Sequence, residues 1–162
     1  MTPEEAETVT PPQTSAAEQT TAPRPAAVRA ALEIFSDPWS FAVLQEAFFG
    51  VRRFDGFQAN LGISRGVLAK RLKHLVGHEI LERRLYQERP QRFEYRLTER
   101  GRDMYPIFLE LMRWGERWLE PDADEPALQL IHVPCGAHSH PQTVCDHCGE
   151  PIRAEDMRYE SQ

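Results

Sequence analysis

The sequence predicts a mainly α-helical fold with a small β-hairpin (α+β), followed by a short Cys/His-rich appendage. Apolar residues recur at helical spacing over most of residues 25–119. Within that span the spacing changes to a period of two in two short runs, as in paired strands. All three cysteines fall within residues 132–150. We therefore divide the chain into a first segment 1–24, a folded domain 25–119, a linker 120–128 and a tail 129–162.

The N-terminal segment and the first two helices are predicted from composition and spacing. Residues 1–24 contain almost no large apolar side chain, so we expect them to be disordered. A first helix is predicted over residues 25–35. A second helix, over residues 39–49, is apolar on nearly every side, which indicates burial. Gly50 is expected to end it in the left-handed conformation.

The stretch from Arg53 to Ile80 predicts a helix, a tight turn and a second helix. Gly62 permits the turn, and Ser64 is a favourable N-cap for the second helix. That helix has an apolar stripe formed by Val67, Leu68, Leu72, Leu75 and Val76. Its opposite side carries Arg65, Gly66, Ala69, Lys70 and Lys73. We expect the stripe to be buried and the opposite side to face solvent.

A β-hairpin and a final long helix complete the predicted domain. Residues 81–86 and 92–97 alternate as strands around a flexible tip. In the second strand Phe93, Tyr95 and Leu97 are expected to face the core, and Arg92, Glu94 and Arg96 to face outward. Thr98 is expected to cap one helix that runs to about Leu119. The side chains available for burial on this helix are Tyr105, Phe108, Leu111, Met112, Trp118 and, in part, Trp114.

The charge is unevenly distributed and points to a polyanionic partner. The whole chain carries a net charge of −6, but residues 50–102 contain 13 basic and 6 acidic residues, a local charge of +7. Helix, turn, helix and hairpin in this order form a winged helix, whose second helix can enter the major groove of DNA. We therefore predict double-stranded DNA as the partner of this surface. The predicted contacts are Ser64 and Arg65 at the helix start, Lys70, Arg71 and Lys73 along it, and Arg89 and Arg92 at the hairpin tip.

Several motifs together resemble a known family over about residues 26–119. They are RRFDGF, GISRGVLAKRLKHL and LERRLY followed by PQRFEYRLTERG. In these motifs the chain resembles the HxlR-type winged-helix transcription regulators of bacteria. The resemblance implies a homodimer formed by the first and last helices, and a palindromic operator whose half-sites lie about one helical turn apart. It also implies base contacts by Ser64, Arg65 and Lys70, and phosphate contacts by Arg53, Lys73, Arg89 and Arg92.

The chain departs from this family at one position. Some members sense oxidants or electrophiles through a cysteine just ahead of the first helix. The corresponding residue here is Ala26. We therefore expect any regulatory signal to enter by another route, and the effector stays unidentified.

The tail sequence predicts a structural zinc site with one zinc per chain. Cys145 and Cys148 are two residues apart and precede a glycine, and HVPCG provides a matching half-site through His132 and Cys135. His138, His140 and His147 are the alternatives for the non-cysteine ligand. So short a tail has too little apolar surface to fold unaided. A reversible disulfide between Cys145 and Cys148 is the alternative, and a catalytic zinc served by Glu150 is disfavoured because the tail is too small to enclose a pocket.

The sequence also argues against some function classes and leaves two alternatives open. We find no nucleophile–base pair and no phosphate-cradling glycine loop, so we do not expect an enzyme. No apolar run is long enough to span a bilayer and the N-terminus does not read as a secretory signal, so we expect a cytoplasmic protein. The alternatives to a simple transcription regulator are a metal- or redox-responsive regulator that uses the cysteine cluster as sensor, and a winged-helix protein-interaction adaptor.

Overall fold

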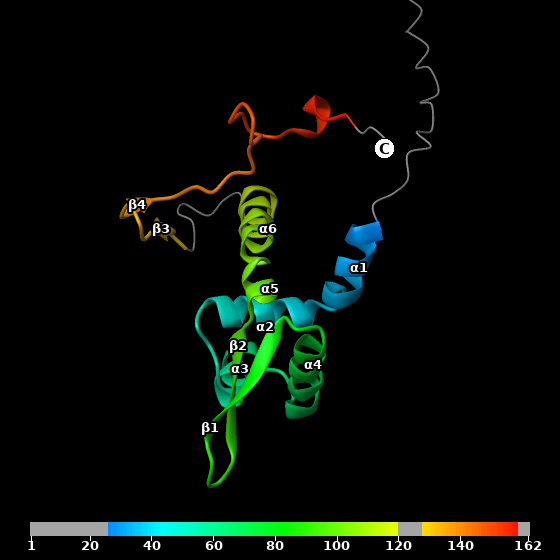
Figure 1. Cartoon of the computed structure of the whole chain (residues 1–162), viewed down its shortest axis with the longest axis vertical. Coiled ribbons are helices and arrows are strands. Elements are labelled where there is room, and N and C mark those ends of the chain that lie inside the picture. The colour runs from blue at the N-terminus through cyan, green and yellow to red at the C-terminus, as the bar shows by residue number, and fades with distance from the viewer. Residues whose placement is uncertain (1–25, 120–127, 159–162) are drawn as a thin grey trace, which may run out of the picture.

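The computed structural model describes residues 26–119 and 128–158 of the chain. The predictions for residues 1–24 and for 120–127 of the linker therefore lie outside the described residues. Four helices precede the hairpin (Figure 1). They are α1 (Ala26–Phe35), α2 (Pro38–Phe48), α3 (Phe54–Leu61) and α4 (Arg65–Gly77). The four helices predicted from the sequence are thus confirmed, with bounds that differ by up to three residues, since α4 ends at Gly77 and not at Ile80.

Helix α2 lies at the centre of the core, as its apolar sequence predicts. Asp37 is its N-cap, and one carboxylate oxygen accepts from the backbone N–H groups of Trp39 at 2.9 Å and Ser40 at 3.2 Å. Val43 and Leu44 are fully buried. They belong to one cluster with Phe57 of α3, Leu68, Leu72 and Leu75 of α4, and Ile80 and Leu81. This cluster is what supports α4 from behind.

The turn between α3 and α4 is built as the sequence predicts. Gly62 adopts a left-handed φ of 64°. The Ser64 hydroxyl accepts from the Val67 N–H at 3.3 Å and so caps α4. One detail of the apolar stripe is wrong, because Val67 is 36% exposed. The buried face of α4 consists of Leu68, Leu72 and Leu75, and Val67 lies at the edge of this face.

The predicted hairpin forms an antiparallel pair of strands, β1 (Leu81–Gln87) and β2 (Arg92–Leu97), with Leu81 opposite Leu97. A short third segment joins it, since the Tyr95 N–H donates to the Arg52 carbonyl at 2.7 Å. Tyr95 and Leu97 pack against the core as expected. This packing fixes the base of the hairpin, while the tip extends away from the domain (Figure 1).

Two side chains of β2 differ from the predicted alternation. Phe93 was expected to face the core, but it lies nearer the hairpin tip than Tyr95. There the Arg83 guanidinium covers its ring, 3.4 Å from the centroid. Glu94 was expected to face outward, but its side chain is only 15% exposed and pairs with Arg96 at 2.7 Å. The segment before α3 lies beside Glu94 through a bridge with Arg53, which accounts for its partial burial.

The single long helix predicted after Thr98 is wrong, because the structure contains two. Thr98 caps α5 (Glu99–Arg102) by accepting from the Gly101 N–H at 3.0 Å. The chain then breaks before α6 (Tyr105–Trp118). Pro106 near the start of α6 has no N–H to donate to the preceding turn, and it disfavours helical geometry in the residue before it. The break lets α6 take its own direction.

Most of the apolar side chains predicted to be buried on this last helix are exposed. Phe108 is 6% exposed and packs beside α2, but Leu111, Trp114 and Trp118 are 50%, 53% and 60% exposed. The reason is geometric, since α6 projects beyond the core formed by α2, α3 and α4 (Figure 1). Within the described part of the chain, these three side chains are therefore left at least half uncovered.

The tail after residue 127 contains short elements only. They are β3 (Ile131–His132), β4 (Ala137–His138) and the 3-10 turn η1 (Ala154–Asp156). The tail contacts the domain at Glu110 of α6, which accepts from both the N–H and the hydroxyl of Thr143 at 3.1 Å. Among the described helices, none combines the length and apolarity needed to cross a membrane.

Candidate nucleic-acid interface

The outward face of α4 is a continuous exposed surface with basic side chains. Arg65, Lys70 and Lys73 are exposed, and the small residues Gly66 and Ala69 lie between them. A Cβ atom added to Gly66 would meet no atom within 4 Å. The opposite side of the helix is anchored in the core, so the exposed face is held rigidly. A rigid helix with small residues and cations on one side can approach closely into a major groove.

Arg65 is held at the start of α4 by residues of α3. Its Nη1 lies 3.3 Å from Gln58 Oε1 and 3.7 Å from Asp55 Oδ1. Its guanidinium also lies 4.9 Å from the centroid of the Phe54 ring. The Arg65 and Asp55 side chains are 70% and 88% exposed, so their attraction is weak. The guanidinium is therefore positioned beside the groove-facing surface and can exchange Asp55 for another acceptor.

Arg71 lies on a different side of α4 from these residues. Its Nη2 is 2.9 Å from Asp37 Oδ2, and the two side chains are 21% and 29% exposed. This ion pair joins α4 to the start of α2. The predicted phosphate contact at Arg71 is untested, but the geometry gives its guanidinium a structural partner instead. Sequence spacing contains no signal for a pair between residues so far apart in the chain.

The hairpin adds a second group of cations near α4, at the same end of the domain (Figure 1). Arg89 and Arg92 are exposed at the tip, where the Gln87 amide donates to the Arg89 carbonyl at 3.0 Å. Arg53 is bridged to Glu94 in the middle of the hairpin, and its guanidinium lies 4.8 Å from the centroid of the Tyr86 ring. Tyr86 was not anticipated as a positioning residue, and its place on an exposed strand face is the signal that could have shown it.

Arg83 and Arg84 have partners within the hairpin itself. Arg84 pairs with Glu82 at 2.6 Å, and Arg83 covers Phe93. Arg89 and Arg92 have no ion pair or side-chain hydrogen bond within the described residues. The tip is thus the part of the hairpin whose cations are most accessible to phosphate oxygens.

The tail contains the two turns predicted as zinc half-sites. In the first turn, His132 Nδ1 lies 3.3 Å from Cys135 Sγ. Gly136 has a φ of 71° and donates its N–H to the His132 carbonyl at 2.8 Å. In the second turn, Gly149 has a φ of 77° and donates to the Cys145 carbonyl at 2.8 Å. Each turn has the tight, glycine-closed form in which a metal-binding thiolate is presented.

Hydrogen bonds in the second turn favour the thiolate form of one cysteine. The Cys148 N–H lowers the pKa of Cys145, and the His147 N–H and the Cys148 thiol lower it further. The two turns are nevertheless apart. Within residues 26–119 and 128–158, no group of three or more His, Cys, Asp or Glu side chains is close enough to hold a metal. The structure thus forms both predicted pairs without bringing the four ligands together.

The alternative histidine ligands are distributed differently. His147 lies within the second turn, whereas His138 and His140 line a cavity against α6. None of them completes a metal site among the described residues. The choice of the non-cysteine ligand therefore stays a prediction.

Comparison with known proteins gives a consistent result. The family described as HxlR-like helix-turn-helix matches residues 34–123. An uncharacterized HTH-type transcriptional regulator of Mycobacterium tuberculosis is 45% identical over 127 residues, covering 78% of this chain and 80% of that protein.

Two solved structures extend this comparison. PA1607, described as a proposed transcription factor, has a TM-score of 0.71 and 32% identity, with 89% of this chain and 97% of that chain covered. The reduced form of the redox regulator HypR has a TM-score of 0.53 and 28% identity, with 60% and 99% covered.

The Arg71–Asp37 pair gives a stability prediction. Arg71→Met keeps the aliphatic stem but removes the charge, which leaves the Asp37 carboxylate without its partner. We expect the free energy of unfolding to fall by about 1–3 kcal/mol, measured by urea denaturation. Lys73→Met is the matched control on the exposed face and should change it by less than about 0.5 kcal/mol. If Arg71→Met lowers the free energy of unfolding no more than Lys73→Met does, the structural role of Arg71 is contradicted.

Proposed function

The chain belongs to the HxlR-like helix-turn-helix family, and from this premise we propose that it regulates transcription as a homodimer on a palindromic operator. It is a DNA-binding transcriptional regulator and not an enzyme. The observation that carries the proposal is the exposed basic face of α4 beside the exposed arginines of the hairpin tip. A cytoplasmic location is part of the proposal, since the chromosome of the bacterial relatives lies there.

In this proposal α4 enters the major groove and the hairpin follows the adjacent backbone or minor groove. Ser64, Arg65 and Lys70 lie on the leading part of the exposed face, which supports roles in base contact. Phosphate contacts are assigned to Lys73 on α4, to Arg53 just before α3, and to Arg89 and Arg92 on the hairpin. These residues supply the charge attraction, and the first group supplies sequence preference.

The homodimer is supported by the apolar side chains that α1 and α6 leave exposed. On α6 these form one stripe at helical spacing, Ile107, Leu111, Trp114 and Trp118, each at least half exposed. On α1, Val28 and Leu32 are each 58% exposed. Both helices project from the end of the domain opposite the hairpin tip (Figure 1). A two-fold interface there would leave both copies of α4 free to meet successive major grooves.

We further propose that the tail binds one structural zinc through His132, Cys135, Cys145 and Cys148. The support is the donor set and the two glycine-closed turns. The apolar side chains of the tail also lack a core of their own, since Val133 is 87% and Ile131 58% exposed. Zinc would supply the energy that draws the two turns together. The described arrangement does not form this set, so the proposal requires the turns to approach.

A metal- or redox-responsive regulator is the second candidate. HypR, a structural neighbour, is a redox regulator by name. The hydrogen bonds that lower the pKa of Cys145 favour its reactive thiolate form, and Cys148 is placed to resolve an oxidised Cys145. No observation on the described residues specifically favours the third candidate, a protein-interaction adaptor.

If Arg65 contacts a base and Lys73 a phosphate, replacing each by alanine should affect DNA binding differently. Arg65→Ala should weaken operator binding by about 1–3 kcal/mol and reduce the preference at one base position. Lys73→Ala should weaken binding to all DNA alike and reduce the salt slope by about one. Titrations on operator and random duplexes at several salt concentrations measure both. An equal loss on both duplexes for Arg65→Ala would reject its assignment to a base.

The dimer proposal is tested by a charge placed on the α6 stripe. Trp114→Glu should weaken self-association by at least about 2 kcal/mol, because it buries an unpaired carboxylate in the interface. Sedimentation equilibrium measures this change. Val133→Glu is the matched control, because Val133 is an apolar residue of the tail that is 87% exposed and belongs to neither helix. A Trp114→Glu protein that remains as dimeric as the wild type would contradict the interface.

The zinc proposal is tested by metal analysis of the purified full chain. We expect about one zinc per chain, and loss of that zinc in Cys145→Ser. His132→Ala should also lose it, whereas His147→Ala should retain it. Zinc-free protein whose tail amides keep their protection from hydrogen exchange would reject a structural zinc. Operator titration with and without a chelator then separates a structural metal from a regulatory one.

A further inference from the structure

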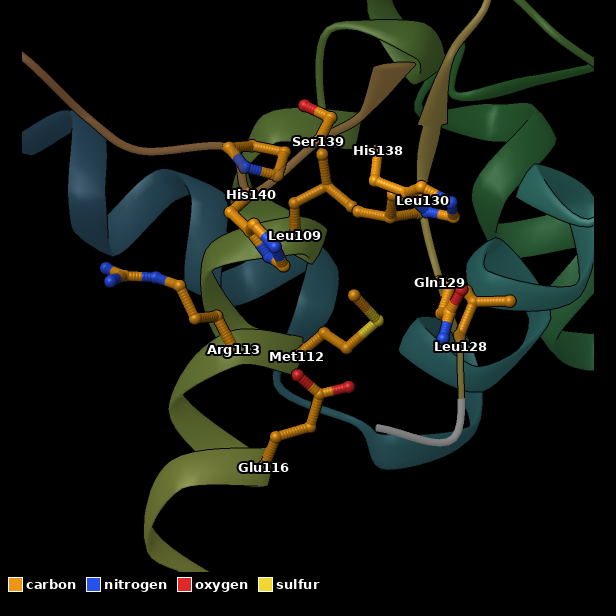
Figure 2. Close-up of a pocket in the computed structure, with 11 residues that line it drawn as sticks. Leu109, Met112, Arg113, Glu116, Leu128, Gln129, Leu130, His138, Ser139 and His140 are labelled. Atoms are coloured by element: carbon orange, nitrogen blue, oxygen red, sulfur yellow. The ribbon is translucent and has the colours of Figure 1, made fainter. Parts of the chain in front are cut away.

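A cavity of about 390 Å³ lies between α6 and the tail, outside the DNA-facing surface. Its size is within the range of small-molecule sites in proteins. One wall is the side of α6 that carries Leu109, Met112 and Glu116 (Figure 2). The opposite wall comes from residues 128–130 and 138–141 of the tail. The cavity is therefore formed by two segments, which are also joined by the hydrogen bonds between Glu110 and Thr143.

The walls of this cavity are mostly apolar. Leu109, Met112 and Leu130 are half-buried there, and Leu128 closes one side. A second cavity of about 490 Å³ between α2 and α6 shares Met112, Glu116 and Leu128 with the first. Phe41, Phe49 and Phe108 line that second cavity. A ring system placed beside Met112 would thus meet aliphatic and aromatic side chains.

The charged groups at the cavity favour a positively charged ligand. Figure 2 shows the Glu116 carboxylate directed toward Met112, while Arg113, which also lines the cavity, extends its guanidinium away from Met112. Arg113 is already paired, since its Nε and Nη2 lie 3.1 and 2.6 Å from Glu110 Oε2. His138 and His140 at the rim are acceptors as well as donors when neutral. Among the described residues that line the cavity, Glu116 is therefore the charged group without an ion-pair partner.

The tail wall is held in place by a small number of polar contacts. Glu110 accepts two hydrogen bonds from Thr143, and the Ser139 N–H donates to the Leu130 carbonyl at 2.9 Å to close the tail segment on itself. A ligand that touches both walls would add apolar contact between α6 and the tail. The opposite side of α6 carries the apolar stripe proposed for dimerisation. A ligand that shifts α6 at the cavity wall would therefore also shift the proposed dimer interface.

We propose that this cavity binds a small amphipathic cation, a ring system carrying one ammonium group, and that this ligand acts as the effector of the regulator. The ring lies against Leu109, Met112 and Leu130, and the ammonium group donates to the Glu116 carboxylate. Its action as an effector rests on the function proposed above, whereas its binding does not. The assignment follows from the chemistry of the walls: apolar surface for the ring and one carboxylate for the charge.

Methionine methyl groups provide a direct test. The chain has 4 methionines, and Met112 lines the cavity, whereas Met104 packs against the core and Met157 lies near the end of the tail. In the full chain labelled at methionine methyl carbons, 1-naphthylmethylamine should shift the Met112 resonance in a saturable manner and leave Met104 unshifted. The carboxylate 1-naphthoate has the same ring with opposite charge and should not saturate. Absence of a saturable Met112 shift at millimolar amine would overturn the site.

Two variants test the role of the carboxylate. Glu116→Gln keeps the shape but removes the charge, and should weaken binding of the amine by about tenfold or more. Glu155→Gln, on the exposed η1 turn, is the matched control and should bind as the wild type does. Equal affinity of the Glu116→Gln and control proteins would overturn the charge assignment.

The effector role is measured separately, by operator affinity with and without 1-naphthylmethylamine. A change in affinity that Glu116→Gln abolishes supports the role. Saturable binding with no change in operator affinity overturns the role and leaves the site. Protein that binds no DNA, yet shows the Met112 shift, contradicts the proposed function without contradicting the site.

Discussion

The carboxylate of Asp37 is the contact on which the DNA-facing surface depends. One of its oxygens accepts the first N–H groups of α2, and the other pairs with Arg71 of α4. A single side chain therefore both begins the central helix and fixes the angle of the helix that faces DNA. His74 of α4 adds a tie to α1, since its Nε2 lies 3.1 Å from the Ile34 carbonyl and must donate to it. The exposed face of α4 can be rigid because these contacts and the core lie behind it.

Local signals in the sequence predicted most of the fold. Gly62, Ser64 and Thr98 each act through their own backbone neighbourhood, and each was found in its predicted role. The break before α6 was missed although Pro106 was visible in the sequence. The partner of Arg71 could not be predicted, since an ion pair between distant residues leaves no periodic trace in the sequence.

The same limit applies to the faces of α6 and to the tail. Helical spacing shows that a stripe such as Leu111 and Trp114 is apolar, but it does not distinguish a core from an interface between copies. The direction of α6, which projects beyond the core, shows that this stripe lies outside the core of the chain (Figure 1). In the tail, the spacing of Cys145 and Cys148 predicts a turn correctly, but the distance between the two turns depends on the path of the whole segment.

Residues 50–102 hold 13 of the 19 Lys and Arg residues, in a chain whose net charge is −6. A chromosome offers about a million or more non-specific sites that compete with any operator. Beyond about one Debye length, roughly 8–10 Å, a duplex meets little of either charge. At closer range, the face formed by α4 and the hairpin is attracted to the duplex more strongly than the acidic remainder of the chain. The charge distribution thus favours the orientation in which α4 faces the duplex before any base is read.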